Sequence, residues 1–430
     1  MRILLINPPN CGRSIPEERY GISSIKQIFR GEPLALEMLA GNLVDHEVRI
    51  LDLKVEPNGL QKTLVDFSPQ LVGLTAMTCE ANSALKLART IREQSSATIV
   101  IGGSHASNVP EDFNRPEIDW IAIGLGTQSL HDLVEGIASA QTIDIPGMAR
   151  STPGRALCWT ARDYTSADLV CPNRPRYDLV DHYRPSYTLQ SLGLQMGLVA
   201  SAAGCPYDCN FCCIGPVTGK RYLTAPTEHV VAAIDCLTES PVIRLVDANS
   251  FGNRVHALQL AEAIARAGIS KQYLADVRAD TVVNYPELLR QWKEIGLRAV
   301  VIGFEEITDR SLTSFNKQSN AATSREAIAI LHQLGITIVG DFIISPDYTE
   351  ENFDKLAGFV DEQCVELPMY TVLTPLPGTR LHQQLKARIT VDDLDYYTLT
   401  NSVMATRLPE EIFYQRYADL LARGHRNARV

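Results

Sequence analysis

Short apolar runs alternate with helix-like segments along the first 150 residues. A brief apolar run indicates a buried strand, whereas apolar residues recurring every three to four positions indicate a helix. The predicted strands are residues 2–7, 47–53, 71–75, 98–101 and 119–123. The predicted helices are residues 33–44, 60–67, 81–93 and 128–137. This alternation predicts a doubly wound, Rossmann-like parallel sheet, which binds ligands at the carboxyl ends of its strands.

Glycines and small polar residues follow several of these strands. Residues at such strand ends are candidates for binding a cofactor, because the carboxyl ends of parallel strands share one edge. The candidates are Thr78, Gly102, Gly103, Ser104, His105, Gly124 and Gly126. A single histidine in a turn is also typical of a solvated or capping residue, so His105 has two interpretations.

A second alternating series follows an irregular, proline-containing linker at residues 151–193. Its predicted strands are residues 194–201, 242–247, 272–277, 299–304, 337–344 and 369–373. Its predicted helices are residues 228–237, 257–267, 287–295, 324–334 and 351–362. Six strand-helix units predict a partial (β/α)6 barrel over residues 194–385, whose chemistry lies at the carboxyl mouth. Residues 386–430 are expected to form a short helical cap.

Three cysteines lie directly after the first predicted barrel strand. Cys205, Cys209 and Cys212 have the spacing C-x3-C-x2-C within the run that begins at Gly204. Thiolates select iron-sulfur clusters or zinc, and three of them hold a four-iron cube with one iron left open. Structural zinc sites normally draw two pairs of ligands from separate segments, and the sequence has no second C-x2-C pair. The spacing predicts a metal centre, with iron-sulfur favoured over zinc.

Composition narrows the possible functions. The chain has 430 residues, 45% hydrophobic content, a net charge of −10 and ten cysteines. The negative charge disfavours a nucleic-acid binder, which needs a basic face. The apolar run at residues 1–9 is too short for a signal peptide or a membrane span. Several of the ten cysteines are isolated in the sequence, which favours free thiols in a reducing compartment over a disulfide framework. These features predict a cytoplasmic protein without a transmembrane segment.

The cysteine motif, with the aromatic Phe211 before its third cysteine, resembles the signature of the radical S-adenosylmethionine superfamily. The resemblance implies that Cys205, Cys209 and Cys212 are catalytic ligands of a 4Fe-4S cluster, which cleaves S-adenosylmethionine to a 5'-deoxyadenosyl radical. Further positions match cofactor-binding residues of the family at the ends of successive strands: Phe211, Asp247, Asn249, Arg278, Glu305 and, more weakly, Asp341. Arg278 could equally form a structural ion pair with Asp276 or Asp280.

The whole chain resembles members of this superfamily that carry an N-terminal cobalamin-binding-type domain. Asn7-Pro-Pro9 and Gly102-Gly-Ser-His105 contribute to the likeness, and the runs 268–273, 292–297 and 405–409 are most similar to the hopanoid C-3 methylase group. Two features leave cobalamin binding open. The sequence has no D-x-H-x-x-G motif, and Gly124-Leu-Gly-Thr127 stands where relatives commonly have Gly-Glu-Gly-Glu.

The resemblance implies a transferase, with two mechanisms left open. With cobalamin, it implies a methyltransferase acting on an unactivated carbon or on phosphorus of a small-molecule natural product or lipid. Without cobalamin, it implies aminocarboxypropyl transfer to a soft nucleophile such as arsenic, or a radical cyclisation or rearrangement. A flavodoxin- or ferredoxin-type protein is the expected electron donor. A non-catalytic sensor is the alternative from another functional class.

Overall fold

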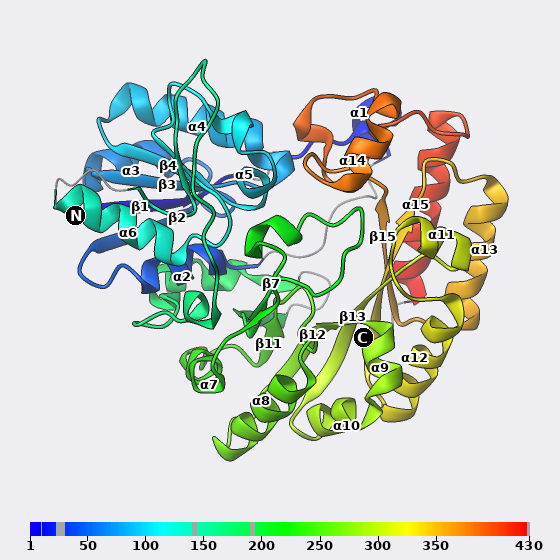
Figure 1. Ribbon diagram of the computed structural model, residues 1–430. Coiled ribbons are helices and arrows are strands. Elements are labelled where there is room, and N and C mark those ends of the chain that lie inside the picture. The colour runs from blue at the N-terminus through cyan, green and yellow to red at the C-terminus, as the bar shows by residue number, and fades with distance from the viewer. Residues whose placement is uncertain (10, 23–30, 140–143, 190–193, 428–430) are drawn as a thin grey trace.

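The computed structural model describes residues 1–9, 11–22, 31–139, 144–189 and 194–427, and shows two α/β units side by side (Figure 1). The last residues of the predicted linker, 190–193, and of the predicted cap, 428–430, lie outside the described residues. The predicted fold class is confirmed, because each unit is built from parallel strands with helices on the sheet faces.

The first unit is a six-stranded sheet with the order β2-β1-β3-β4-β5-β6. Its strands are β1 (Arg2–Asn7), β2 (Glu47–Asp52), β3 (Leu71–Thr75), β4 (Thr98–Gly102), β5 (Trp120–Ala122) and β6 (Met148–Arg150). The first five are parallel and match the predicted strands; β6 is antiparallel to β5 and was not predicted. The strand order reverses between β1 and β3, so the ligand crevice of a doubly wound sheet falls after Asn7 and Thr75.

Helices cover both faces of this sheet. They are α2 (Leu34–Gly41), α3 (Leu60–Phe67), α4 (Ala81–Gln94), α5 (Ser104–Asn108) and α6 (Thr127–Ala138). Helix α1 (Ile15–Tyr20) lies instead against the C-terminal segment, where Arg19 pairs with Glu410 at 2.8 Å. Leu4 and Ile6 of β1 pack into one apolar core, while Ile3 and Leu5 pack into another on the opposite face. Burial on both faces explains why β1 is a continuous apolar run and not an alternating one.

The second unit is an open, curved sheet with the order β15-β14-β13-β12-β11-β8-β7. Its parallel strands are β8 (Leu194–Val199), β11 (Val242–Leu245), β12 (Gln272–Val277), β13 (Leu297–Glu305), β14 (Thr337–Ile344) and β15 (Leu367–Val372). All six correspond to predicted strands. The short β7 (Thr188–Leu189) pairs antiparallel with β8 and was not predicted, because it lies within the irregular linker.

The helices that follow its strands are α7 (Thr227–Cys236), α8 (Arg254–Arg266), α9 (Ala279–Asn284), α10 (Pro286–Glu294), α11 (Asp309–Ser314), α12 (Ala321–Leu334) and α13 (Glu350–Glu362). Along β12, Tyr273, Ala275 and Val277 are buried against these helices, while Leu274 and Asp276 on the other face are half-buried. The concave face of the barrel is therefore partly open, and it forms a chamber.

The C-terminal segment is helical, as predicted, but divides into two parts. Helix α14 (Arg380–Leu385) and the short turns η6 (Lys386–Arg388) and η7 (Leu394–Tyr396) lie between the two units (Figure 1). Asn82 of the first unit donates to Asp393 and Asp395 at 3.1 and 3.0 Å. The long helix α15 (Glu410–Asn427) instead packs outside β15, where Tyr417 Oη donates to the carbonyl of Tyr370 at 2.8 Å. Only the first part lies near the mouth.

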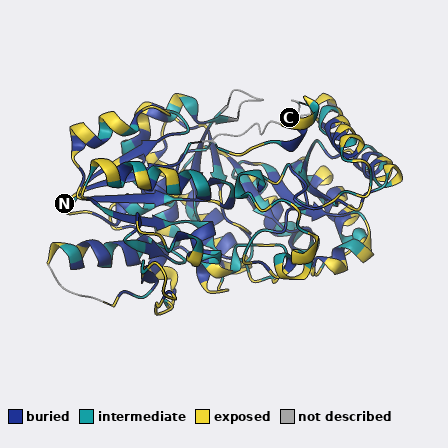
Figure 2. Cartoon of the chain, turned by 90° about the horizontal axis from the view of Figure 1, so that it is seen from above, coloured by how far each residue is buried: buried dark blue, intermediate teal, exposed yellow. Residues whose placement is uncertain are grey.

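Burial separates the sheets from the outer helix faces (Figure 2). Both sheets are dark and enclosed, whereas the outward faces of the helices are exposed. Within the described ranges, no helix has the length and apolar character that crossing a membrane requires.

Candidate functional site

The three cysteines lie on a loop closed by a small hairpin. Strand β9 (Ala202–Ala203) pairs antiparallel with β10 (Leu223–Thr224), so the chain between them leaves and returns at the same point. Gly204 begins the loop with a φ of +80°, and a Cβ there would lie 2.0 Å from the carbonyl oxygen of Arg221. Only glycine fits this backbone conformation and this space.

The loop is fixed by segments distant in sequence. The Asn210 amide N–H donates to the carbonyl of Phe315 at 3.1 Å, and its side chain donates to the carbonyl of Ser314 at 2.8 Å. The amide of Leu381, in α14, donates to the carbonyl of Asn210 at 2.9 Å. Phe211 packs edge-on against Phe315 with ring centroids 5.5 Å apart. Phe211 thus packs against apolar residues of the barrel and of α14 and holds the loop against them.

The three thiols differ in exposure, and burial raises the pKa of two of them, that of Cys212 to about 12. Cys205 and Cys209 are half-buried and Cys212 is exposed. Burial raises the pKa of the Cys209 thiol, while the nearby cations Lys317 and Arg278 lower it. Within the described residues, no three His, Cys, Asp or Glu side chains converge as ligands of one ion. A cubane cluster does not require that arrangement, because each thiolate binds a different iron.

Asp247 and Asn249 follow β11, and they have different roles. The Asp247 carboxylate accepts from the amides of Ser201 and Ala202, both at 2.8 Å, and from the Ser201 hydroxyl at 2.6 Å. Burial raises the pKa of Asp247 to about 6. These bonds use both carboxylate oxygens to hold the start of the cysteine loop. Among the described residues the Oδ2 atom accepts a single bond, so it keeps capacity for another donor, and the contact of Asp247 with the amino group of S-adenosylmethionine stays a prediction.

Asn249 has the opposite character. It is 1% exposed, and neither its amide nitrogen nor its amide oxygen has a hydrogen-bond partner among the described residues. A buried, unpartnered amide is costly unless a ligand completes it. Asn249 therefore fits the amino-acid moiety of S-adenosylmethionine, for which it offers both a donor and an acceptor.

Arg278 directly follows β12 and Glu305 ends β13, and each is held by a charged partner. Arg278 pairs with Asp280 at 2.9 Å and lies 3.5 Å from the ring centroid of Tyr207, in the cysteine loop. Glu305 pairs with Lys317 at 2.7 Å and has a left-handed φ of +63°. Such strain in a non-glycine residue persists where the surroundings enforce it, and it is common at functional sites. The structural ion pair considered for Arg278 is present, with Asp280.

Asp341 lies on the concave face of β14. The charges that act on it are Glu305, Asp276, Arg244 and Lys317, and two of these residues, Glu305 and Lys317, also act on Cys209. The barrel therefore brings Cys209, Arg278, Glu305 and Asp341 to one chamber, and their contacts with the cofactor stay predictions. Lys317 and Arg244 were missed, because nothing in their local sequence marks them as facing the chamber.

The predicted residues of the first unit divide into two groups. Gly103 and Gly124 have φ values of +108° and +91°, and a Cβ at Gly103 would lie 2.6 Å from the carbonyl oxygen of Ala76. Gly102, Ser104 and Gly126 are half-buried at the same sheet edge. Beside these glycines the space is filled by the protein itself, by Ala76 at Gly103 and by the linker residue Tyr164 at Gly124, so the glycines allow close packing at this edge. Their contact with cobalamin stays a prediction.

His105 and Thr78 are placed differently from what we expected. His105 is 1% exposed, and its ring lies between the Thr78 hydroxyl at 3.2 Å and the Asp112 carboxylate at 2.9 Å. Both ring nitrogens are thus used inside the unit, and the expectation that the imidazole lies at the mouth is wrong. The neighbouring Met77, which was not predicted as a site residue, is 51% exposed after β3.

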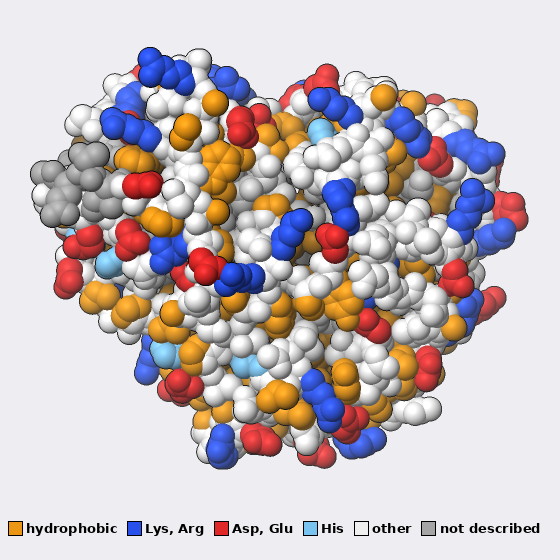
Figure 3. Space-filling view, in the orientation of Figure 1, with side chains coloured by type: hydrophobic (Ala, Val, Ile, Leu, Met, Phe, Trp, Pro, Cys, Tyr) orange, Lys and Arg blue, Asp and Glu red, His pale blue; other side chains and the backbone are white. Residues whose placement is uncertain are grey.

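The two units meet at the cysteine loop. The Asn108 side chain, at the end of α5, donates to the carbonyl of Cys213 at 3.0 Å. Gly378, which precedes α14, also lies close to Asn108, because a Cβ at Gly378 would be 2.6 Å from the carbonyl oxygen of Asn108. Figure 3 shows the surface hollowed between the two units on this side. The carboxyl edges of both sheets therefore border one interdomain crevice.

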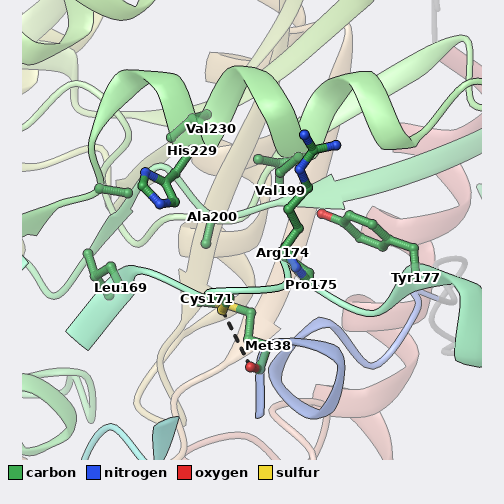
Figure 4. A pocket seen from close by; sticks show the side chains of 12 residues that line it. Met38, Leu169, Cys171, Arg174, Pro175, Tyr177, Val199, Ala200, His229 and Val230 are labelled. Atoms are coloured by element: carbon green, nitrogen blue, oxygen red, sulfur yellow. Dashed lines mark hydrogen bonds between the residues drawn. The ribbon is translucent and has the colours of Figure 1, made fainter. Parts of the chain in front are cut away.

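A small cavity lies elsewhere, between α2, the linker and α7 (Figure 4). Its volume is about 30 Å³, and Cys171 lines it with its thiol 3.4 Å from the carbonyl oxygen of Met38. That volume is suited to water, not to a cofactor.

Family models match both units. The B12 binding domain matches residues 26–134, and the radical SAM superfamily matches residues 199–360. The chain is a radical S-adenosylmethionine enzyme with an N-terminal B12 binding domain. The family assignment agrees with the resemblance found in the sequence, and it includes the 4Fe-4S cluster, S-adenosylmethionine and cobalamin as cofactors.

Similar proteins include several methyltransferases. The radical S-adenosylmethionine enzyme described here is 29% identical to the hopanoid C-3 methylase of Methylococcus capsulatus over 90% of this chain and 75% of that protein. It is 27% identical to an uncharacterized methyltransferase of Pyrococcus horikoshii over 94% of this chain and 88% of that protein.

Two solved structures share the fold of the whole chain. The methyltransferase TsrM from Kitasatospora setae, solved with cobalamin and a [4Fe-4S] cluster, has a TM-score of 0.74 and 18% identity over 98% of this chain and 88% of its own. OxsB, solved with aqua-cobalamin and S-adenosylmethionine, has a TM-score of 0.73 and 15% identity over 94% of this chain. This chain covers 64% of OxsB.

Proposed function

We propose that the protein is a cobalamin-dependent methyltransferase that acts on an unactivated carbon of a small molecule or lipid. The observation that carries the proposal is the shared crevice, where Asn108 of the B12 binding domain contacts the backbone of the cysteine loop at Cys213. Methyl transfer of this kind needs a radical source and a methyl carrier at one substrate. A single crevice meets that requirement.

The side chains at the crevice have distinct tasks. Cys205, Cys209 and Cys212 hold the cluster, and Asn249 hydrogen-bonds the amino-acid part of S-adenosylmethionine. When bound, the cluster supplies one electron for sulfonium cleavage and cobalamin supplies the methyl group. Phe211 and Phe315 form an apolar wall behind the loop, which limits access of water to reactive species.

Exposed apolar side chains support a substrate with an apolar surface. Met77 follows β3 and is 51% exposed, and Val246 follows β11 and is 36% exposed. Leu399 is 37% exposed, and its carbonyl accepts from the amide of Val372 at the end of β15. Exposed apolar side chains at strand ends that border a crevice are typical of ligand-binding surfaces.

Product analysis tests this function. Anaerobically reconstituted enzyme with hydroxocobalamin, a reductant and S-adenosylmethionine labelled in the methyl group is expected to form labelled methylcobalamin and S-adenosylhomocysteine. It is also expected to release 5'-deoxyadenosine. Methylthioadenosine as the main product, without labelled methylcobalamin, would instead support aminocarboxypropyl transfer and overturn the proposal.

We further propose that an acidic one-electron carrier of the flavodoxin or ferredoxin type docks on α14 and η6. This segment contacts the cysteine loop through Leu381 and through the ion pair of Arg380 with Asp208. Residues 380–391 contain three Lys or Arg residues and no acid, although the chain has a net charge of −10. Figure 3 shows Lys and Arg side chains along this side of the crevice. Complementary charge accelerates the encounter with an acidic carrier.

Reversing the charge at Lys386 is expected to weaken this encounter. The variant Lys386→Glu should raise the KM for a reduced acidic flavodoxin about fivefold at low salt, with a smaller effect at high salt. Its rate with dithionite should not change, because dithionite needs no docking surface. Lys62→Glu, an exposed site on α3, is the control. An unchanged KM in Lys386→Glu would contradict the proposed docking surface.

A further inference from the structure

Seven charged side chains surround the barrel chamber, and six of them form ion pairs. The pairs are Arg244 with Asp276 at 3.3 Å, Arg278 with Asp280 at 2.9 Å, and Lys317 with Glu305 at 2.7 Å. The seventh is Asp341, for which the described part of the chain provides neither a hydrogen bond nor an ion pair. Four carboxylates therefore face three cations.

The surroundings of Asp341 do not neutralise it. Glu305 on β13 and Asp276 on β12 repel its negative charge, while Arg244 and Lys317 attract it more weakly, since each is committed to another carboxylate. On the other side, its neighbour in β15 is the uncharged Met369. Burial, followed by the two carboxylates, raises the pKa of Asp341 to about 7. An isolated carboxylate in such a place either binds a proton or needs a cation.

The cosubstrate brings one net positive charge. Its ammonium and carboxylate groups cancel, which leaves the sulfonium. We propose that Asp341 is the counter-ion of the S-adenosylmethionine sulfonium, an inference that rests on the proposed function. Asp341 is the carboxylate of this set that has no cation partner, and the sulfonium supplies one.

This role makes the site selective for S-adenosylmethionine over S-adenosylhomocysteine, the product that lacks the sulfonium charge. S-Adenosylhomocysteine has the same adenosyl and amino-acid groups but a thioether in place of the sulfonium, so it leaves Asp341 unpaired. The role also links binding to pH. In the free protein Asp341 holds a proton below pH 7, and the sulfonium displaces it. The affinity for S-adenosylmethionine should therefore fall up to about tenfold for each pH unit below 7, and that for S-adenosylhomocysteine should not.

Calorimetry on the anaerobically reconstituted full-length enzyme, with its cluster oxidised so that no turnover occurs, tests the inference. Titrations in two buffers of different ionisation enthalpy give the number of protons released. At pH 6, binding of S-adenosylmethionine should release about one proton, and at pH 8 close to none. S-Adenosylhomocysteine should release none at either pH. Asp341→Asn should abolish the proton release and reduce the preference for S-adenosylmethionine about tenfold at pH 8.

The outcomes separate this inference from the function on which it rests. Asp347→Asn removes an exposed carboxylate beyond the same strand, which is paired with Arg388 at 2.6 Å, and it should change neither quantity. If Asp341→Asn weakened the binding of S-adenosylmethionine and S-adenosylhomocysteine equally, the counter-ion role would be overturned. The unaltered enzyme gives a second test without a variant: a preference for S-adenosylmethionine that does not change with pH would overturn the role as well. Failure of the unaltered enzyme to bind either ligand would overturn the proposed function itself.

Discussion

Replacing Cys209 with alanine is expected to lower the rate of S-adenosylmethionine cleavage on the order of a thousandfold. Cys209 is one of the three thiols that the C-x3-C-x2-C spacing offers to the cluster. With only two thiolates, two of the four irons have no protein ligand. Clusters that the protein ligates so weakly are not retained. Iron content, the optical spectrum of the cluster and release of 5'-deoxyadenosine measure the effect.

Cys213→Ala is the matched control. Cys213 adjoins Cys212, but the contact that the structure assigns to it is made by its backbone carbonyl, which Asn108 reaches at 3.0 Å. Alanine keeps that carbonyl. The variant should therefore retain iron and cleavage activity. If Cys213→Ala lost the cluster while Cys209→Ala kept it, the assignment of the ligands would be wrong.

Local sequence was sufficient for the strands, the helices and the cysteine loop. The strands of both sheets are apolar runs because they are buried on at least one face by helices, and this requirement is visible at short range. The cysteines lie within eight residues of one another, so their spacing alone indicates a common centre. Asn249 was a candidate for a different reason, because it lies shortly after a predicted strand, and its contact with S-adenosylmethionine stays a prediction.

Features that depend on tertiary contacts were not predictable. His105 has the sequence context of a mouth residue, yet Thr78 and Asp112 hold its ring inside the unit. Lys317 reaches Glu305 only because the loop after α11 folds back over the end of β13. The contact between Asn108 and Cys213 joins positions 105 residues apart. Partners at such separations carry no local signal in a single sequence.

Replacing Gly204 with alanine is expected to remove the cluster without altering a cysteine. The added Cβ would lie 2.0 Å from the carbonyl oxygen of Arg221 and 2.5 Å from the Thr218 hydroxyl, at a φ of +80°. The conformation alone costs about 1–3 kcal/mol for a residue with a Cβ, and the backbone clash adds to it. The loop must move at its first residue, next to Cys205. We expect bound iron to fall below half and cleavage to fall about a hundredfold, since misplacement of about 1 Å has effects of that size.

Gly358→Ala controls for the substitution itself. Gly358 lies within α13, and a Cβ there would meet nothing within 4 Å. Because alanine is less flexible than glycine in the unfolded chain, this variant should gain about 0.4–1 kcal/mol in the free energy of unfolding and keep its iron. Thermal unfolding and iron analysis of both variants decide the question. Full iron content in Gly204→Ala would show that the cluster does not depend on the geometry of the loop, because the spacing of the cysteines is the same in both variants.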